Sequence, residues 1–548
     1  MPDRRTGPVL AAAFAAILAA SALGARTLAQ ETPSPAPSAT PSPQVSGAPG
    51  SPTPSPTPSP SPTPPPILVV PQAGAVPVGE HQVLQISSVL GDVTVKVADP
   101  AVVDAVVDQG TRTLTLTGKA PGATVVTVGD ARGLTRDVPV RVAFLAGTIA
   151  PSAVLRLTGD PASADYVKMQ AVALAKRLAQ ARPGAQVVAT VDQLTYAGAL
   201  AQDDVVTIDV PVLIQGVGFF EADGTTRVRV ENVAAPRIAP ATLMVSDYPE
   251  RLESDGVLFT ADLARETPSR FLYFHFNPAG QPDRRIVLRA ENTSPEPAVV
   301  QFISGDGGPG ANEMEVGHDA TKRFLVRVVQ NEGSLIAIPG NAAVNLVEDA
   351  VPAGAVVANL LQLRVLSGGG VHLTLFAQDA TSDPGESLAS TELLEGAYKH
   401  ARGIYDIPEF HDARAWSVSD PYLELSVGQI PLPNRLKGEA LSGDYGVLQS
   451  FVVNVMNPYA TPQSIAIYEN PRGGRATGTY LIDGVLIQSH QVPAYSRYKI
   501  RQYVVPAKGF VRVTIVTMPE GGSFYPLKLI FAPDDGSVAP GAPGSPVY

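Results

Sequence analysis

A proline-rich tract near the N-terminus limits where a folded core can begin. It covers residues 31–66 and reads ETPSPAPSATPSPQVSGAPGSPTPSPTPSPSPTPPP. Such a composition has too little apolar surface to offset the entropy lost on folding, so we expect a disordered Pro/Ser/Thr linker over residues 30–66. Alternation of Pro with Ser or Thr also favours an extended polyproline II backbone. Folded domains are therefore expected only from Ile67 onward.

The residues before the tract have the layout of a secretory signal peptide. Two arginines precede an apolar, alanine-rich run over residues 9–23, and Thr27 and Ala29 occupy the −3 and −1 positions of a cleavage site. We therefore expect residues 1–29 to direct export, with the signal either cleaved or retained as an N-terminal anchor. No other apolar run reaches the ~20 residues that span a bilayer.

Composition narrows the class of protein. The 548 residues carry a net charge of −11 and include no cysteine. The length beyond the linker suggests three to five domains of ~100–150 residues each. An acidic chain without a basic block is unsuited to nucleic acid, and the lack of cysteine excludes disulfides, thiolate nucleophiles and zinc–thiolate sites. A long exported chain without cysteine also points to a bacterium.

Residues 67–145 have the pattern of a small all-β domain. Leu114 and Leu116 alternate with threonines, and valines alternate with polar residues over 93–97. Turn-forming residues such as Pro121-Gly122 separate the candidate strands. Short alternating strands with regular turns predict a sandwich or barrel-like module.

Two phrases in this domain carry a family resemblance. VADPAVVDAVVD (97–108) and LTGKAPGATVVTVGDARG (116–133) resemble the small N-terminal domain that precedes secretin pores in bacterial pilus-assembly proteins. Bacterial Ig-like domains have a similar pattern and are the second choice. The resemblance implies an envelope-associated fold. The rest of the chain lacks the glycine-rich strands of a secretin pore, so the resemblance does not imply that this protein forms a pore.

Residues 146–234 combine strands with one convincing helix. The helix is expected between Asp160, a candidate N-cap, and the helix-stopping Arg182-Pro183-Gly184. Its apolar stripe consists of Val167, Ala171, Leu174 and Leu178. Candidate strands flank it, and a hairpin over 218–230 is expected to turn at Asp223-Gly224. This order predicts one α+β domain with a single long helix.

The C-terminal half contains two pairs of similar phrases in the same order. IVLRAENTSPEPAVV (286–300) parallels FVVNVMNPYATPQSI (451–465), and LRVLSGGGVHLTLFAQD (363–379) parallels VTMPEGGSFYPLKLIFAPD (516–534). Both members of the second pair end in Phe-Ala-x-Asp, and we expect them to be equivalent late hairpins. Two copies of one β-sandwich, related by duplication, are the economical interpretation.

The expected sandwich domains are residues 235–380 and 405–535, with a linker at 381–404 and a disordered tail at 536–548. Asn292 and Asn457 stand at matching positions, each five residues before a proline. We interpret both as turn formers, because Asn bonds its own backbone and Pro stops the strand. The alternation also predicts which side chains face the cores. These are Leu288 and Ala290 in one copy and Val453 and Val455 in the other.

No residue constellation predicts catalysis. The chain has seven histidines, at positions 81, 275, 318, 372, 400, 411 and 490, without metal-ligand spacing. We expect His275 to be a hydrogen-bonded or solvent-facing strand residue and His318 to lie in a turn. The GDGGPG run at 305–310 lacks the ligands of a calcium loop and the Lys of a P-loop, so a flexible hairpin loop is expected.

Carboxylates and aromatic residues give no firmer site. Asp379, Asp383 and Glu386 lie in or beside a polar linker, and the sequence cannot pair them across a cleft. Most of a loose aromatic group is expected to pack in a core. It consists of Tyr405, Trp416, Tyr422 and Tyr445. We therefore expect no catalytic residue, cofactor or metal, and the ligand-binding residues stay unknown.

The sequence thus predicts a mainly β, multidomain, exported bacterial protein that is not an enzyme. The first hypothesis is a structural or assembly partner of a pilus or secretion system in the periplasm or at the surface. Its partners would be envelope or surface proteins. The alternative is an adhesive or glycan-binding protein whose sandwiches contact cell-wall or surface glycans. An enzyme of unfamiliar type is a third, less favoured, hypothesis.

Overall fold

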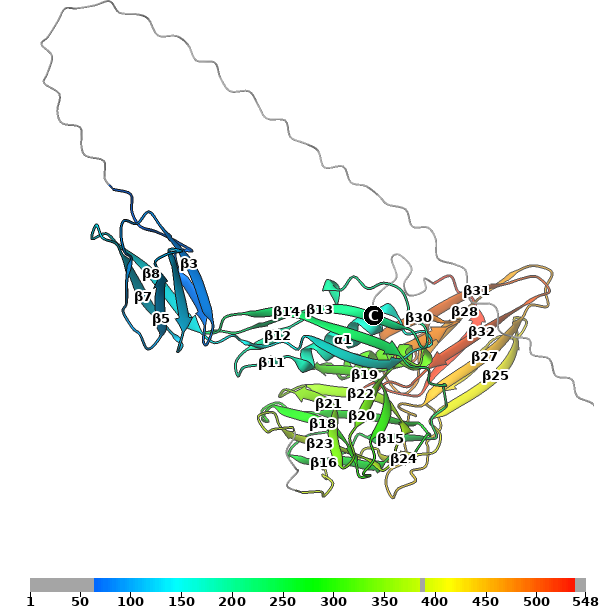
Figure 1. The fold of residues 1–548 in the computed structure, drawn as a ribbon. Coiled ribbons are helices and arrows are strands. Elements are labelled where there is room, and N and C mark those ends of the chain that lie inside the picture. The colour runs from blue at the N-terminus through cyan, green and yellow to red at the C-terminus, as the bar shows by residue number, and fades with distance from the viewer. Residues whose placement is uncertain (1–63, 385–389, 538–548) are drawn as a thin grey trace, which may run out of the picture. The chain divides into compact units, whose positions relative to one another are not determined.

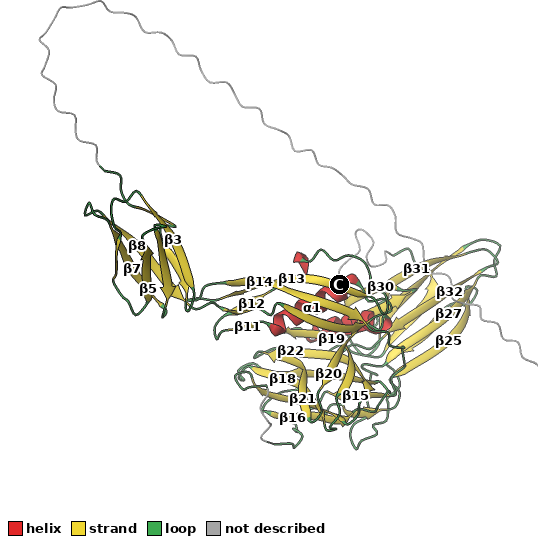
Figure 2. Cartoon of the chain, viewed as in Figure 1, coloured by secondary structure: helices red, strands yellow, loops and turns green. Residues whose placement is uncertain are grey.

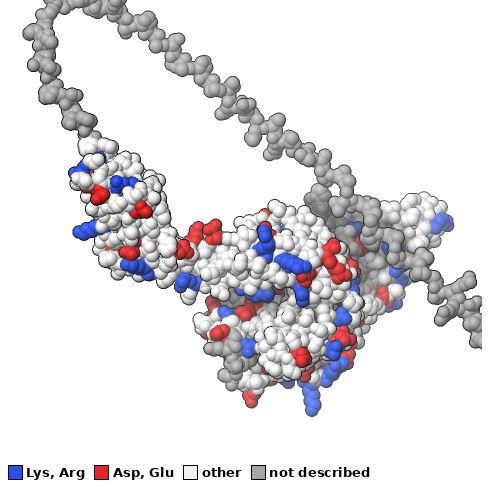
Figure 3. Space-filling model, viewed as in Figure 1, with Lys and Arg blue, Asp and Glu red and all other residues white. Residues whose placement is uncertain are grey.

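The computed structural model describes residues 64–384 and 390–537 (Figures 1 and 2). They are mainly β-strands in several separate sheets, with two α-helices, which confirms the predicted fold class. The expected signal peptide, most of the linker and most of the tail lie outside the described residues. Among the described helices, none has the length and apolarity needed to cross a membrane. On the face shown in Figure 3, acidic and basic side chains are interspersed among uncharged ones.

Residues 67–143 form the predicted small all-β domain, a sandwich of two four-stranded sheets. Their orders are β1-β3-β6-β5 and β2-β8-β7-β4. The alternation seen in the sequence buries Leu84, Leu114 and Val126 in a shared core. The strands are β1 (Leu68–Val70), β2 (Gly74–Pro77), β3 (His81–Ser87), β4 (Thr94–Val97), β5 (Val103–Asp108), β6 (Thr113–Gly118), β7 (Gly122–Gly129) and β8 (Thr135–Ala143).

A ten-stranded sheet follows, in the order β12-β13-β14-β10-β20-β19-β22-β17-β15-β24. β10 joins its two parts, pairing in parallel with β14 and antiparallel with β20. The sheet therefore continues across the expected domain boundary at 234–235. Its strands are β10 (Ser152–Thr158), β12 (Gln186–Val188), β13 (Val205–Gln215), β14 (Ala222–Asn232), β15 (Thr242–Ser246), β17 (Ser269–Phe276), β19 (Ala298–Gly310), β20 (Gly333–Ile338), β22 (Val356–Ser367) and β24 (Arg402–Tyr405). A two-stranded sheet, β9 (Gly147–Thr148) with β11 (Gln180–Ala181), and a short 3₁₀ helix, η1 (Val191–Gln193), complete this region.

Helix α1 (Ala164–Leu178) is the predicted helix, and Val167, Ala171 and Leu174 of its stripe pack on β10, β13 and β14. Leu178, the last residue of the predicted stripe, is exposed. The expected Asp160 cap is wrong. The N-cap is Ser163, whose hydroxyl accepts a hydrogen bond from the backbone N–H of Tyr166. The expected hairpin turn is also misplaced, because Asp223-Gly224 lie inside β14 and pair with β13.

Helix α2 (Glu313–Val329) is absent from the sequence prediction. It lies against β19 and β22 on the same face of the sheet as α1, and Arg327 of α2 is stacked over the Tyr166 ring of α1. The GDGGPG run is the end of strand β19, so the expected hairpin loop is wrong. Glycine is required there by close approach: a Cβ at Gly305 would lie 2.3 Å from the Phe324 nitrogen, and one at Gly307 would lie 2.0 Å from the Val316 oxygen.

The first of the two later sandwiches pairs part of the ten-stranded sheet with a four-stranded sheet, β16-β23-β18-β21. As predicted, Leu288 and Ala290 face this core, and both are fully buried. Its further strands are β16 (Gly256–Asp262), β18 (Arg284–Asn292), β21 (Ala342–Val351) and β23 (Val371–Asp379). β24, from the expected linker 381–404, adds to the edge of the ten-stranded sheet beside β15.

The last sandwich has a five-stranded sheet, β25-β27-β32-β29-β30, and a four-stranded sheet, β26-β33-β28-β31. Val453 and Val455 are buried between them, as the alternation predicts. The strands are β25 (Glu409–Ser417), β26 (Leu423–Val427), β27 (Leu448–Met456), β28 (Gln463–Pro471), β29 (Ala476–Ile482), β30 (Val485–Val492), β31 (Tyr498–Val505), β32 (Phe510–Thr517) and β33 (Leu527–Pro533).

The two later sandwiches are topologically equivalent around Asn292 and Asn457. In the first, β18 pairs with β21, and β19 pairs with β20 and β22. In the second, β27 pairs with β32, and β28 pairs with β31 and β33. All six pairings are antiparallel. This confirms that 286–300 and 451–465 are equivalent strand pairs, as duplication requires.

Both asparagines stabilise the connection in the same way. The Asn292 amide donates to the carbonyls of Glu296, Ile338 and Pro339. The Asn457 amide donates to the carbonyls of Thr461, Val505 and Pro506. Each side chain also accepts a backbone N–H two residues on. The turn-forming interpretation is confirmed, and each asparagine additionally ties down the end of a distant strand.

The second predicted equivalence is wrong. Residues 363–379 span β22 and β23, which lie in different sheets, and 516–534 span β32 and β33, which also lie in different sheets. Neither is a hairpin. By the pairings above, β33 corresponds to β22, whereas β23 lies beside β18. Both Phe-Ala pairs are buried. The shared Phe-Ala-x-Asp sequence therefore marks the buried end of a strand, and not equivalent strands in the two sandwiches.

We predict that Asn457→Ala lowers the free energy of unfolding of the last sandwich by ~1–3 kcal/mol, because three carbonyl acceptors lose their donor in a largely buried setting. Asn454→Ala is the matched control, since Asn454 is exposed on β27, the strand that ends just before Asn457. Urea denaturation followed by tryptophan fluorescence measures the difference, because the single tryptophan, Trp416, lies in this core. Equal stability of the two variants would contradict the assigned role.

Candidate functional site

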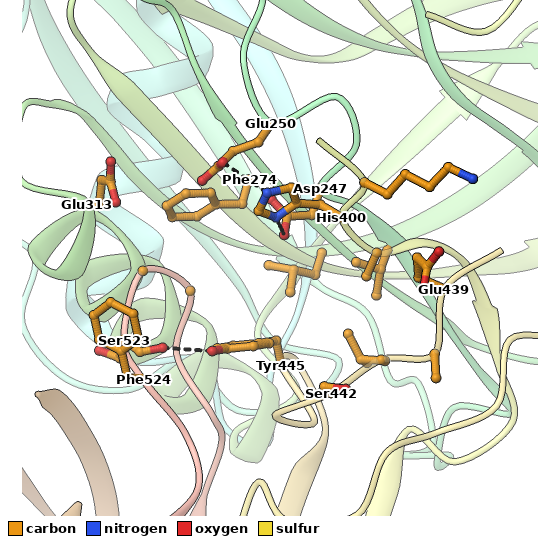
Figure 4. Close-up of a pocket in the computed structure, with 18 residues that line it drawn as sticks. Asp247, Glu250, Phe274, Glu313, His400, Glu439, Ser442, Tyr445, Ser523 and Phe524 are labelled. Atoms are coloured by element: carbon orange, nitrogen blue, oxygen red, sulfur yellow. Dashed lines mark hydrogen bonds and ion pairs between the residues drawn. The ribbon is translucent and has the colours of Figure 1, made fainter. Parts of the chain in front are cut away.

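A cavity of 410 Å³ lies where six segments of the chain meet. The ends of β15 and β17 contribute Asp247 and Phe274, and the start of α2 contributes Glu313. The segment before β24 contributes His400, and the two other walls come from 439–445 and 521–524. Figure 4 shows these side chains around the cavity. The cavity therefore combines residues from both later sandwiches, including a segment expected to be a linker.

One wall holds an imidazole between two carboxylates. His400 Nδ1 lies 3.4 Å from Asp247 Oδ2, and His400 Nε2 lies 3.3 Å from Glu250 Oε2. All three side chains are about one-third exposed, and Figure 4 shows them pointing toward one another. Such a set can store a proton or offer nitrogen and oxygen ligands to a cation.

The electrostatics of this wall are shaped by burial and by charge. Burial, with the Glu250 and Glu313 charges, raises the pKa of Asp247 to about 6, although the hydrogen bond from His400 opposes the shift. The hydrogen bond to Asp247, and then the nearby carboxylate charges, raise the pKa of His400 above its ordinary value despite partial burial. The imidazole therefore holds its proton more strongly than a free histidine does.

His275 lies directly behind this wall and is fully buried. Its Nδ1 lies 2.9 Å from the Pro249 carbonyl oxygen, and its Nε2 lies 3.2 Å from the Ser246 hydroxyl. Burial lowers the pKa of His275 to about 4, so the ring is neutral. The expectation of a hydrogen-bonded strand histidine is confirmed, and the residue supports the turn that carries Asp247 and Glu250.

Much of the other side of the cavity is aromatic, although Glu439 also lies there. The Tyr445 hydroxyl donates to the Ser523 carbonyl at 2.7 Å, and the Tyr445 and Tyr525 rings meet edge to face with centroids 5.9 Å apart. Phe524 is 57% exposed at the cavity. This wall offers ring faces and edges opposite the carboxylates.

A second polar cluster lies out of solvent between α2 and the last sandwich. His318 Nδ1 lies 2.9 Å from Glu520 Oε2, and His318 Nε2 lies 3.1 Å from Gln488 Oε1. The His318 and Glu520 side chains are 1% and 0% exposed. The expectation that His318 lies in a turn is therefore wrong, because it sits inside α2 and bonds across an interface.

Further polar groups extend this cluster. The Thr477 hydroxyl bonds to Glu520 and lies 2.6 Å from the Ser523 hydroxyl. The Ser489 hydroxyl bonds to Glu469, and complete burial raises the pKa of Glu469 to about 8. Burial disfavours a charged His318, but the Glu520 carboxylate outweighs it and raises the pKa of His318 to about 9. The cluster thus holds a buried ion pair beside a carboxylic acid that stays largely protonated at neutral pH.

Arg270 makes a second buried connection between the two sandwiches. Its guanidinium is 0% exposed and donates to Glu409 Oε1 at 2.9 Å. It also donates to the carbonyls of Pro408 at 2.6 Å and Gly446 at 3.3 Å. These contacts hold the start of β25 and the cavity loop around Tyr445 against the ten-stranded sheet.

The candidates raised by the sequence lie elsewhere. Asp379 accepts hydrogen bonds from the backbone and hydroxyl of Thr381, so it forms a turn, and Glu386 lies outside the described residues. Core packing is confirmed for Tyr405 and Trp416, whereas Tyr422 is exposed. His400 is one of the seven histidines noted in the sequence, but no sequence pattern groups it with Asp247 and Glu250. Only the three-residue spacing of Asp247 and Glu250 is visible in the sequence.

Comparison with known proteins identifies one domain. Residues 71–143 match the family described as "Pilus formation protein N terminal region", which confirms the resemblance of the small sandwich. The match covers this domain and not the rest of the chain. No curated protein matches the chain significantly.

Similarities to solved structures are weak. The human desmocollin-1 ectodomain is 13% identical, with a TM-score of 0.13, and the match covers 32% of this chain and 43% of that one. The M60 catalytic domain with two CBM51 domains of Clostridium perfringens ZmpB is 9% identical, with a TM-score of 0.14, covering 85% and 54%. The Bacteroides ovatus glucan-utilisation protein SGBP-B is 12% identical, with a TM-score of 0.12, covering 56% and 71%. TM-scores this low do not establish a shared overall fold.

The His318–Glu520 pair predicts a pH dependence of stability. Because folding raises the pKa of His318 from 6.5 to about 9, its contribution is complete below pH 6.5 and is lost as pH rises through 9. The raised pKa of Glu469 also makes the stability fall as pH rises. The contribution of His318 is therefore measured as the difference in pH dependence between the parent and His318→Gln. We expect the free energy of unfolding of the parent to fall more steeply between pH 6.5 and 9, by about 1.4 kcal/mol per pH unit.

Chemical denaturation at a series of pH values provides this measurement. His372→Gln is the matched control, because His372 also contacts a carboxylate, Asp262, at 2.7 Å but lies at the surface. The control should keep the pH slope of the parent. Parallel slopes for the parent and His318→Gln would show that the buried pair does not take up a proton on folding.

Proposed function

We propose that this is an exported, non-catalytic protein of the bacterial envelope that serves as a structural or assembly partner of a pilus or secretion system. The match of residues 71–143 to the pilus-formation family carries the proposal. The signal-like N-terminus and the proline-rich linker support export and a spacer before this domain. The large β assembly that follows would present surfaces to envelope or surface proteins.

The small sandwich has a face suited to protein contact. Val83 and Val106 are 59% and 62% exposed on one sheet. Both are paired with Thr115, so the three residues form a row across β3, β6 and β5. Leu68 and Val70 are exposed on the neighbouring strand β1. Asp104 and Asp108 flank Val106 on the same outer face, so the apolar row has acidic residues at its edge. An apolar row with a polar border contributes to a protein interface when a partner covers it.

A capture experiment tests the proposal. The tagged mature chain is incubated with envelope fractions of the bacterium that produces it, and the bound proteins are identified by mass spectrometry. We expect a pilus or secretion component to bind, and Val83→Lys with Val106→Lys to abolish binding, because two charges would be buried without partners. Val125→Lys is the control, since Val125 is exposed on the other sheet of the same domain.

The measurement can refute the proposal in two ways. Capture of no pilus or secretion component by the parent chain would remove its basis. Capture that survives the double substitution would show that this face is not the contact surface. Circular dichroism of the isolated variants confirms that the substitutions, which lie on the outer face, leave the fold intact.

Glycan binding is the second candidate function, and the large cavity favours it. Aromatic rings at Tyr445 and Phe524 face carboxylates at Asp247 and Glu250 across the cavity. Ring faces with polar groups opposite are suited to a sugar, which has both apolar and hydroxyl-bearing faces. A cell-surface role for the sandwiches would follow.

We predict that, if the cavity binds glycans, soluble cell-wall or capsular fragments shift the intrinsic tyrosine and tryptophan fluorescence of the parent chain. Phe524→Ala should weaken the binding by about tenfold, through loss of one stacking ring. Phe510→Ala is the matched control, because Phe510 is also exposed but lies away from the cavity lining on β32. An equal loss in both variants would exclude the cavity as the binding site.

A further inference from the structure

The set formed by Asp247, Glu250 and His400 has a geometry that the envelope function does not use. Asp247 and Glu250 follow β15 within one turn of chain, and His400 precedes β24, which pairs with β15. One ligand atom from each residue can be chosen so that all three lie within 4.8 Å of one another. We propose that these residues bind a divalent transition-metal cation of the Zn²⁺ class at the cavity wall.

The separations suit a cation on one ring nitrogen of His400, because Asp247 lies at Nδ1 and Glu250 lies at Nε2. The two nitrogen–oxygen distances, 3.4 and 3.3 Å, are longer than the usual 2.7–3.2 Å of strong hydrogen bonds. Two ligands held at ~2.0–2.1 Å from a tetrahedral Zn²⁺ are separated by ~3.3 Å. A cation on one ring nitrogen already has one carboxylate at this separation. The other carboxylate faces the opposite ring nitrogen, so it joins the same cation only if its side chain adopts another rotamer.

An unpaired oxygen gives an independent indication. Asp247 Oδ1 is out of contact with solvent and has no hydrogen-bond donor. A buried carboxylate oxygen without a partner is unfavourable, and a cation would supply the missing interaction. Glu313 and Glu439 also line the cavity, against the single lysine Lys399. The field of the cavity therefore attracts cations.

The ligand types select the class of metal. One imidazole with two carboxylates suits Zn²⁺ and similar transition metals, whereas Ca²⁺ and Mg²⁺ take oxygen ligands only. Three protein ligands leave a fourth position for water or another ligand on the cavity side. The cation would also link the segment before β24 to the turn after β15, across the edge of the ten-stranded sheet.

Isothermal titration calorimetry of the chelator-treated mature chain with ZnCl₂ tests the proposal. We expect one equivalent of Zn²⁺ to bind. His400→Ala and Asp247→Asn should each weaken the affinity by at least ~100-fold, because loss of a direct ligand costs more than the 10–100-fold typical of an outer partner. His372→Ala should leave the affinity unchanged, since His372 contacts Asp262 but belongs to no set of three close ligand residues in the described part of the chain.

Thermal unfolding without metal shows whether each variant is folded, and Glu250→Gln replaces any variant that is not. The proposal is overturned if the parent binds no Zn²⁺, in which case the three residues form an ion-paired cluster only. It is also overturned if His400→Ala binds Zn²⁺ as the parent does. A third outcome would also overturn it: the chain binds Ca²⁺ with the same affinity as Zn²⁺, and His400→Ala does not change that affinity. The carboxylates alone would then bind cations, without the imidazole.

Discussion

Helix α2 is the element on which the arrangement of the later sandwiches depends. Its apolar face, with Phe324 and Leu325, packs on Leu272 of the ten-stranded sheet and against Leu448 and Met518 of the last sandwich. The helix can approach the sheet this closely only because β19 ends in glycines, whose missing Cβ atoms leave room for the helix backbone. The helix start then forms part of the cavity through Glu313. One packing contact thus positions two sandwiches and the cavity between them.

Buried charges make this contact specific as well as close. His318 of α2 pairs with Glu520, and Arg270 of β17 pairs with Glu409. Removing one member of such a pair leaves a charge buried without a partner and costs ~3–5 kcal/mol, so the two sandwiches are strongly favoured in one docking geometry. The loop that carries Glu520 continues into Gly521–Phe524, which lines the cavity. The interface therefore also determines the shape of the cavity wall.

The alternation of apolar and polar residues correctly predicted side-chain burial in strands that have one face against a core. Leu288 and Val453 are buried as the alternation predicts, and Asn292 and Asn457 form the predicted turns. The predictions failed where a distant element decides the conformation. The residues of α2 include Gly317 beside His318 and Asp319, which resembled a turn, yet Gly317 is required because the Gly521 backbone lies against the helix. The Phe-Ala-x-Asp endings misled for a related reason, since burial at a strand end can arise in either sheet.

The sequence by itself determined the mainly β class, the small pilus-type domain, the faces of the strands and the turn at each asparagine. These follow from interactions between residues close in the chain, or from a side-chain period that separates buried from exposed faces. Only the tertiary structure decided that His400 meets Asp247 and Glu250, and that His318 meets Glu520. A period of two shows that a side chain is buried or exposed, but not which distant segment lies opposite. That choice is made by packing between β15 and β24 and between α2 and the last sandwich.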